Sequence, residues 1–134
     1  MIFLFSKKKE FSSWKIDRKV LKMILECSKE EHPKEFAGFL KAEKSVINEL
    51  ILIPGTISGN EGALLRLHML PVDFGVVGTI HSHPTTSFLP SKPDKELFAK
   101  FGGVHLIVSY PYNEESWKAY NSKGEEVSFE IVDL

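Results

Sequence analysis

The sequence contains a single cysteine, Cys27, among its 134 residues. One cysteine excludes an intrachain disulfide, and with it the small secreted domains that depend on disulfides. It also leaves no cysteine set for a structural zinc site, which usually has four protein ligands. Cys27 lies in an apolar pattern with helical spacing, so we interpret it as a small core residue.

The sequence also lacks an excess of either charge and a long apolar run. The net charge is −1, with 26% charged and 43% hydrophobic residues, so no strong field favours nucleic acid or a membrane surface. The basic run at residues 7–9 is interpreted as a solvated tail. No apolar run approaches the ~20 residues of a membrane span, and "MIFLFSKKK" has its apolar and basic parts in the reverse order of a signal peptide. We expect a cytoplasmic protein with no nucleic-acid or membrane partner.

The length predicts one domain over residues 1–134, with residues 1–13 as an N-terminal tail or an extra edge strand. Residues 1–5 are apolar and would promote association with other molecules if left exposed. They suggest pairing with a second copy of the chain, as a homodimer.

The first helix is predicted within "WKIDRKVLKMILECSKEEH". Asp17 is a suitable N-cap, and Pro33 ends the helix at or before His32. Apolar residues recur at helical spacing, at Ile16, Val20, Ile24 and Cys27.

The remaining pattern predicts strands separated by a second helix. The helix is "SKPDKELFAKF", residues 91–101, and "SWKAYN", "SKGE" and "EVSFEIV" are typical of a closing hairpin whose turn contains Gly124. Apolar and alternating segments predict strands at residues 35–43, 45–53, 64–70, 74–83 and 104–110. Together these elements indicate a mixed α/β domain.

Two histidines lie one residue apart where the strand "VVGTIHSH" ends. Alternate residues of a strand point to the same face, so His81 and His83 present two imidazoles side by side. A catalytic zinc usually has three protein ligands and an open position. Asp94, in the first turn of the next helix, is the nearest third candidate. A His/His/Asp set fits zinc best, although carboxylate ligation leaves other divalent metals open.

The same segment also has the features of a helix cap. Ser91 and Asp94 have the spacing of a capping box, and Pro93 suits the start of the helix. From this segment alone a metal site and a helix cap both remain open, and a cap would also position the carboxylate. Ser82 points to the face opposite the two histidines and is given a structural role. The other histidines are not assigned to a metal, and they are His32, His68 and His105.

Metal-dependent hydrolysis needs a base to manage the proton of the attacking water. Glu35, in "HPKEFAGFL", stands at the start of an otherwise apolar strand, directly after the first helix. The alternative for Glu35 is a solvated carboxylate at a strand end.

Several of these segments together resemble a known family. "HSHP", then six residues, then "SKPD" resembles the signature of the JAMM (MPN-plus, Mov34/PAD-1) zinc metalloproteases. "HPKEFAGFL" is similar to the upstream glutamate segment of that family, and Gly78 before the histidines also fits. "GGVHLIVSYP" resembles the following strand in short archaeal members, so the resemblance covers about residues 14–112.

The resemblance implies an α-β-α sandwich around a mixed β-sheet, similar to cytidine deaminases. It implies one Zn²⁺ per chain held by His81, His83 and Asp94, with Glu35 as the general acid and base and Ser91 stabilising the oxyanion. A serine hydroxyl can both accept a cap hydrogen bond and donate to an oxyanion.

The reaction implied is hydrolysis of the isopeptide bond between the C-terminal glycine of a ubiquitin-like small modifier protein and a lysine. Alternatives are processing of the C-terminus of a sulfur-carrier protein, or a non-catalytic scaffold that binds ubiquitin-like proteins. A DNA-repair relative lacks support from any basic surface pattern. The long insertions and second zinc of eukaryotic deubiquitinases are missing, so we do not expect linkage-selective cleavage of polyubiquitin. An extended modifier tail would add to a sheet edge, and the candidate edge is "ALLRLHML", residues 63–70.

Overall fold

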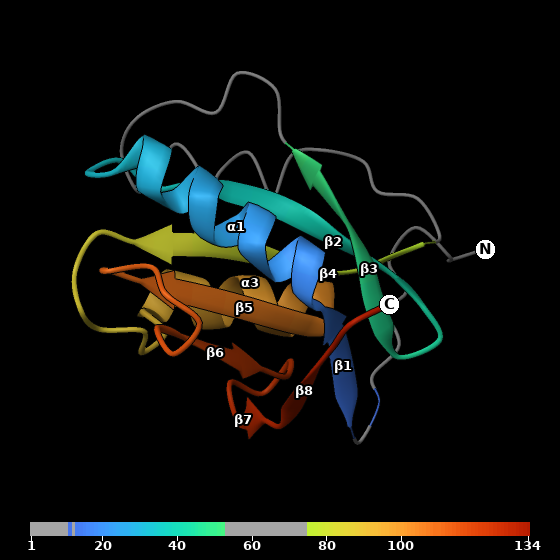
Figure 1. Ribbon diagram of the computed structural model, residues 1–134. Coiled ribbons are helices and arrows are strands. Elements are labelled where there is room, and N and C mark those ends of the chain that lie inside the picture. The colour runs from blue at the N-terminus through green and yellow to red at the C-terminus, as the bar shows by residue number, and fades with distance from the viewer. Residues whose placement is uncertain (1–10, 12, 53–74) are drawn as a thin grey trace.

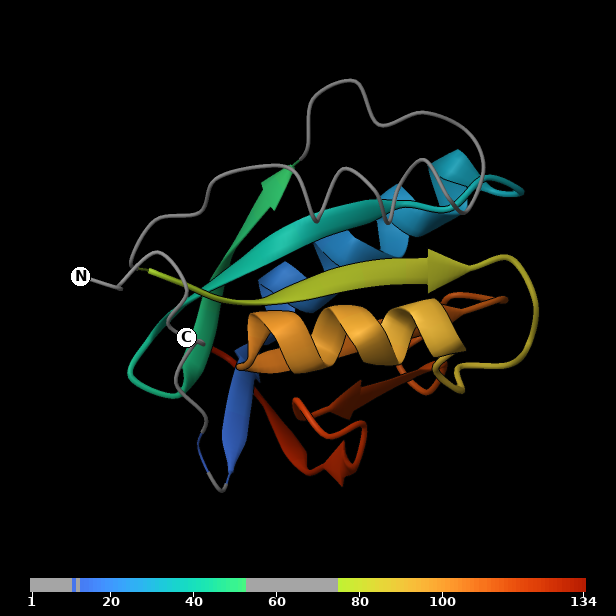
Figure 2. The same cartoon turned by 180° about the vertical axis from the view of Figure 1, so that it is seen from behind.

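The computed structural model describes residue 11 and the ranges 13–52 and 75–134. Over these residues the chain forms one eight-stranded sheet with helices on both of its faces (Figures 1 and 2). None of the helices described is both long and apolar enough to cross a membrane. The apolar residues 1–5, the basic run 7–9, the edge candidate 63–70 and His68 lie outside the described residues.

The N-terminal part of the described chain differs from its prediction in one respect. Trp14–Asp17 forms strand β1, and helix α1 begins only at Arg18–Glu31. Ile16, which the helical pattern included, therefore lies on the strand, fully buried. Asp17 caps the helix as predicted, because its carboxylate accepts from the Lys19 N–H at 3.1 Å, and the helix ends before the cap residue His32.

Four strands make up the centre of the sheet. They are β2 (Ala37–Glu43), β3 (Val46–Leu52), β4 (Val76–His83) and β5 (Val104–Ser109). β2 pairs antiparallel with both β3 and β4, whereas β4 and β5 are parallel. Parallel neighbours need a crossover, and helix α3 (Lys92–Phe101) supplies it. These elements confirm the predicted strands of this region and the second helix, with small differences at their ends.

The predicted closing hairpin is only half right. β6 (Trp117–Tyr120) and β7 (Glu126–Val127) pair antiparallel around a turn with Gly124 at φ +79°. The next segment, β8 (Phe129–Val132), leaves the hairpin and pairs parallel with β1. Its aromatic side chain explains the difference, since the Phe129 ring stacks on the buried Trp14 with centroids 6.2 Å apart.

The strand order is β7-β6-β5-β4-β2-β3-β1-β8. β7 and β8 stand at opposite ends of this order, yet only Ser128 separates them in the chain. The sheet must therefore curl around α1 so that its two ends meet (Figure 1).

Each face of the sheet has its own core. The α1 side holds the larger cluster, in which Leu21 and Ile24 pack among strand residues such as Leu40, Ile80 and Leu106. On the opposite face, Leu97 and Phe98 of α3 contact a second cluster. The α-β-α sandwich that the family resemblance implied is therefore the observed fold.

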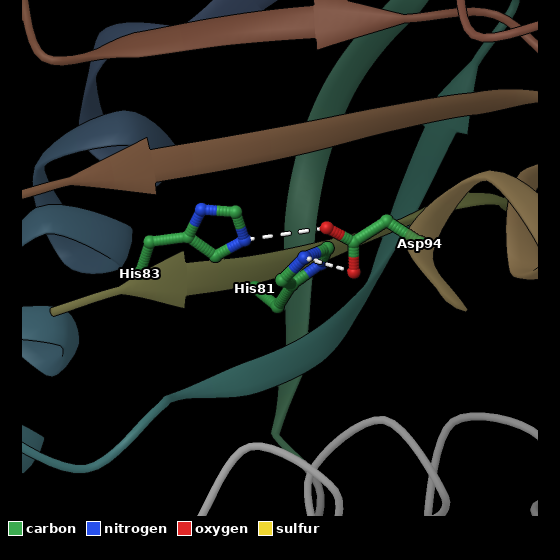
Figure 3. A group of neighbouring side chains, drawn as sticks. All are labelled: His81, His83 and Asp94. Atoms are coloured by element: carbon green, nitrogen blue, oxygen red, sulfur yellow. Dashed lines mark ion pairs between the residues drawn. The ribbon is translucent and has the colours of Figure 1, made fainter. Parts of the chain in front are cut away.

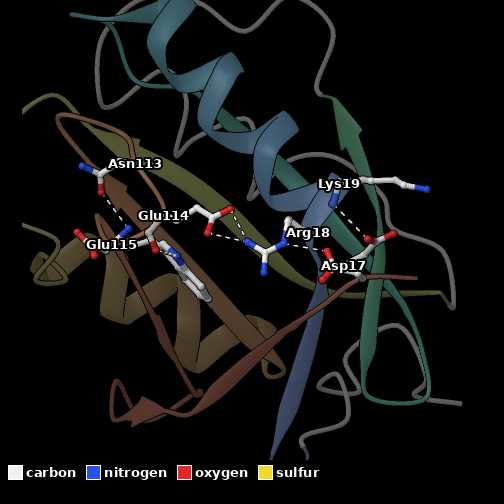
Figure 4. A network of polar contacts seen from close by, with 8 residues as sticks. Asp17, Arg18, Lys19, Asn113, Glu114 and Glu115 are labelled. Atoms are coloured by element: carbon white, nitrogen blue, oxygen red, sulfur yellow. Dashed lines mark hydrogen bonds and ion pairs between the residues drawn. The ribbon is translucent and has the colours of Figure 1, made fainter.

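A short ionic network lies where α1 begins (Figure 4). Arg18 Nη1 lies 2.8 Å from the Glu114 carboxylate, and Arg18 Nε lies 2.8 Å from Asp133 Oδ1. The network joins the first helix to the loop before β6 and to the residue after β8. Its members are well exposed, so each pair contributes at most about 1 kcal/mol.

Gly78 lies at a close approach between the two parallel central strands. A Cβ atom built on it would be 1.6 Å from the Val104 carbonyl oxygen. Only glycine permits this contact, and Gly78 pairs with Val104 at the start of the ladder that runs to His83. The glycine therefore helps to set where the histidine-bearing end of β4 lies.

Candidate metal centre

Three side chains converge where β4 ends and α3 begins (Figure 3). His81 and His83 project from the same face of β4, and Asp94 lies in the first turn of α3. His81 Nε2 is 3.0 Å from Asp94 Oδ1, and His83 Nε2 is 3.3 Å from Asp94 Oδ2. Each residue offers a ligand atom within 4.8 Å of the others, so the structure brings together the three predicted metal ligands.

The tautomer of His83 suits a metal ligand. Its Nδ1 lies 3.0 Å from the Ser87 carbonyl oxygen, which can only accept a hydrogen bond, so Nδ1 carries the proton. Nε2, which lies 3.3 Å from Asp94 Oδ2, is then the nitrogen that would offer its lone pair to a metal. Metal-binding histidines commonly hold their second nitrogen on a backbone carbonyl in this way.

His81 is almost fully buried, with 1% of its surface exposed. Its Nε2 is near Asp94 Oδ1, but the contact lacks the alignment of a hydrogen bond, and Nδ1 has no hydrogen-bond partner among the described residues either. Buried ring nitrogens are rarely left without a partner. An imidazole with an uncommitted nitrogen beside a carboxylate and a second imidazole fits a divalent metal, which would use that lone pair.

Asp94 also closes the helix cap that the sequence predicted. Its Oδ2 accepts from the Ser91 N–H at 2.8 Å, and its own N–H donates to Ser91 Oγ at 3.2 Å. Burial alone would raise the pKa of Asp94, but its contacts with His81 and His83, together with the Ser91 N–H, hold that pKa well below the usual range. The carboxylate is therefore anionic and available to a cation, and the cap and the metal cluster occur together.

Glu35 lies just before β2. β2 and β4 pair Ala37 with His81, and the Ser82 N–H donates to the Phe36 carbonyl oxygen at 2.9 Å. Glu35 is the next residue, and it lies close enough to His81, His83 and Asp94 for their charges to act on it. Glu35 is 6% exposed, and burial raises its pKa while the nearby histidines oppose that rise. The alternative of a solvated strand-end carboxylate does not describe this residue.

The two other described histidines lie outside the cluster, as interpreted from the sequence. His105 is fully buried on β5, where its Nε2 donates to the Gly102 carbonyl at 2.6 Å and its Nδ1 is 2.7 Å from Thr79 Oγ1. His32 is exposed, and its Nδ1 lies 2.7 Å from the Tyr112 hydroxyl.

Sequence reasoning missed Tyr112 as a neighbour of the site. The Tyr112 hydroxyl is also 3.5 Å from the His83 carbonyl oxygen, so Tyr112 links the end of α1 to the end of β4. The available signal was the parallel order of β4 and β5, because residues following two adjacent parallel strands emerge at the same edge of a sheet.

Comparison with known proteins agrees with this geometry. Residues 17–120 match the family described as prokaryotic homologs of the JAB domain. The chain belongs to the JAB, or JAMM/MPN, family. A probable metalloprotease from Haloferax volcanii is 36% identical over 123 residues, which cover 84% of this chain and 76% of that protein.

Several solved structures have the same fold. A JAB1/MPN domain protein from Archaeoglobus fulgidus is 46% identical, with a TM-score of 0.72, covering 92% of this chain and all of that one. A structure described as a JAMM metalloprotease-like zinc site in the proteasome and signalosome is 45% identical, with a TM-score of 0.71, covering 90% and 98%. A protein from Desulfitobacterium hafniense, 18% identical over 90% of this chain and 93% of that chain, shares the fold with a TM-score of 0.61. This JAMM-family chain is thus a metalloprotease whose cofactor is a single zinc ion.

Proposed function

We propose that this JAMM protein is an isopeptidase that hydrolyses the amide bond between the C-terminal glycine of a ubiquitin-like small modifier and a lysine. The observation that supports the proposal is that Glu35 is buried and lies close enough to the three-residue cluster to feel its charges. A site with three protein ligands leaves a coordination position open, as catalytic zinc sites do and structural ones usually do not.

Zinc in such a site acidifies water and polarises the scissile carbonyl. Glu35 accepts the proton of the attacking water on its carboxylate and then delivers it to the departing lysine nitrogen as the carbon–nitrogen bond breaks. The raised pKa of Glu35, caused first by burial, suits a group that must both take and return a proton near neutral pH.

Ser91 is proposed to stabilise the oxyanion. Its Oγ accepts the Asp94 N–H, and no acceptor for its hydroxyl hydrogen is found within the described ranges. Ser91 is exposed at the start of α3, next to the Asp94 ligand. Its hydroxyl is therefore free to donate to charge that develops on the substrate carbonyl oxygen.

The substrate class comes from the family resemblance, in which ubiquitin-like modifiers joined to lysine are the usual substrates. The test is a cleavage assay on matched conjugates of one small modifier that ends in Gly-Gly. One conjugate joins it to a lysine side chain, and the other carries a linear C-terminal extension. Zinc-dependent cleavage of the lysine conjugate supports the isopeptidase, whereas cleavage of the linear extension alone supports the processing of a sulfur-carrier C-terminus. Tight binding of both without cleavage, by zinc-loaded protein, would instead identify a scaffold.

A further inference from the structure

The pairing of β2 with β4 changes character next to the metal site. From Gly38 to Ala37 the two strands follow one antiparallel register, with Ala37 opposite His81. The following pair is Phe36 and Ser82. Phe36 lies between Glu35 and the start of β2, and Ser82 lies between His81 and His83. Any change in how this pair is bonded alters the position of Glu35 relative to the metal ligands.

Only one of the two ladder bonds of this pair is regular. The Ser82 N–H donates to the Phe36 carbonyl oxygen at 2.9 Å. In a regular hydrogen-bonded pair the Phe36 N–H would return a bond to the Ser82 carbonyl. Instead it donates to the Ser82 hydroxyl oxygen at 2.8 Å.

The serine hydroxyl thus takes the place of its own main-chain carbonyl. Ser82 is fully buried, so water cannot compete for the Phe36 N–H, and an unsatisfied buried donor is costly. The bond fixes the peptide group that directly follows Glu35.

We propose that Ser82 is a positioning residue, whose hydroxyl holds Glu35 at its working distance from the three metal ligands. The proposal rests on the function of Glu35 proposed above. The hydroxyl acts as a spacer, because it keeps the Phe36 N–H off the strand carbonyl and so prevents the ladder from closing one pair further toward the site.

Removing the hydroxyl gives a specific structural expectation. In a Ser82→Ala variant the Phe36 N–H has no side-chain acceptor, so we expect it to donate to the main-chain carbonyl oxygen of residue 82 instead. That movement draws Glu35 toward His83. A displacement of about 1 Å at a catalytic group is enough to lower turnover about 10²-fold.

The experiment compares zinc-free crystal structures, Phe36 amide hydrogen exchange, zinc content and steady-state kinetics. The variants are Ser82→Ala and Ser82→Thr, which keeps the hydroxyl. Ser28→Ala is the matched control, since Ser28 is equally buried and its hydroxyl bonds the Ile24 carbonyl inside α1, at 2.8 Å. Thermal unfolding verifies that each variant is folded.

We expect Ser82→Ala to keep full zinc content and an unchanged KM while kcat falls about 10²-fold, with Glu35 displaced and Phe36 exchange altered. Ser82→Thr and Ser28→Ala should retain parental kcat. A Glu35 that superposes on the parent in the Ser82→Ala crystal structure overturns the proposal, and so does a kcat within twofold of the parent in an active enzyme. If the parent cleaves no conjugate, the proposed function fails, while the crystal structures and the exchange rates still decide whether Ser82 positions Glu35.

Discussion

His81 Nε2 lies 3.0 Å from Asp94 Oδ1, yet the two atoms are not aligned as a hydrogen bond, and neither ring nitrogen of the buried imidazole has a hydrogen-bond partner within the described ranges. The strand end and the helix cap hold these groups in place independently of each other.

The first prediction concerns zinc binding. His81→Ala and Asp94→Asn should each reduce bound zinc from about one per chain to a trace, because the loss of one ligand in three leaves too few donors. Metal analysis after dialysis measures this. Asp94→Asn is the sharper variant, since its amide oxygen still accepts the Ser91 N–H that Asp94 Oδ2 holds. In the presence of a metal chelator, the unfolding midpoint of Asp94→Asn should stay close to that of the parent. Full zinc content in this variant would remove Asp94 from the ligand set.

The second prediction separates metal binding from proton transfer at Glu35. Glu35→Gln keeps the shape of the side chain but removes its basic carboxylate, so zinc content should be retained while turnover of a Gly-Gly-linked lysine conjugate is lost. Both are measured on the same preparation. Glu43→Gln, at the exposed far end of β2, serves as the control and should turn over as the parent does. Cleavage by Glu35→Gln at the parental rate would disprove the assigned mechanism.

The third prediction tests whether Ser91 has two separable tasks. Ser91→Ala should cost about 1 kcal/mol of stability through the lost cap and lower kcat about 10²–10³-fold through the lost donor. Ser91→Asp restores a good N-cap but has no hydroxyl, so its stability should recover while its kcat does not. Chemical denaturation and steady-state kinetics give the two readouts. Recovery of kcat in Ser91→Asp would contradict an oxyanion role.

The fourth prediction concerns acid stability and His105. Burial lowers the pKa of His105 to about 3, below its ordinary value of about 6.5. As the pH falls below that ordinary value, His105 becomes protonated in the unfolded chain, whereas in the native protein it stays neutral until about pH 3. The contribution of neutral His105 to the free energy of unfolding is therefore complete above about pH 6.5, and it is lost progressively as the pH drops toward 3.

His105→Gln removes this proton uptake, so the slope of its unfolding free energy between pH 6.5 and 3 should be shallower than in the parent. Denaturation of zinc-free protein at several pH values measures the slope. His32→Gln changes an exposed histidine and should leave the contribution of His105 in place. Parallel curves for the parent and His105→Gln would show that His105 does not resist protonation.

Much of the site was predictable because its signals are local. The His81–His83 alternation depends only on the period of a strand, and the Ser91–Asp94 cap depends only on residues three apart. The place of Glu35 was open until the pairing of β2 with β4 brought it near His81 and His83. The spacer role of Ser82 could not be predicted either. The hydroxyl bonds a main-chain N–H of the opposite strand, and that partner is known only once the pairing of the strands is known.

The end of the chain shows the limit of local patterns in the fold. The segment containing Glu126 and Phe129 reads as one continuous strand, and its break at Ser128 follows from a distant partner. Phe129 packs on Trp14, so the pairing of β8 with β1 reflects a long-range aromatic contact. The same contact explains why Ile16 lies on a strand although its spacing suits the helix.

The pairing of β8 with β1 also has a consequence for how the protein folds. During synthesis N-terminal segments are free to fold first, but β1 gains its longer ladder only when Phe129–Val132 has been made. Nearly the whole described chain separates these partners, and contacts so distant in sequence slow folding because the intervening loop must close first. Until then Trp14 and Phe129 lack each other as partners. The ring of Trp14 therefore waits for the last described strand before Phe129 can cover it.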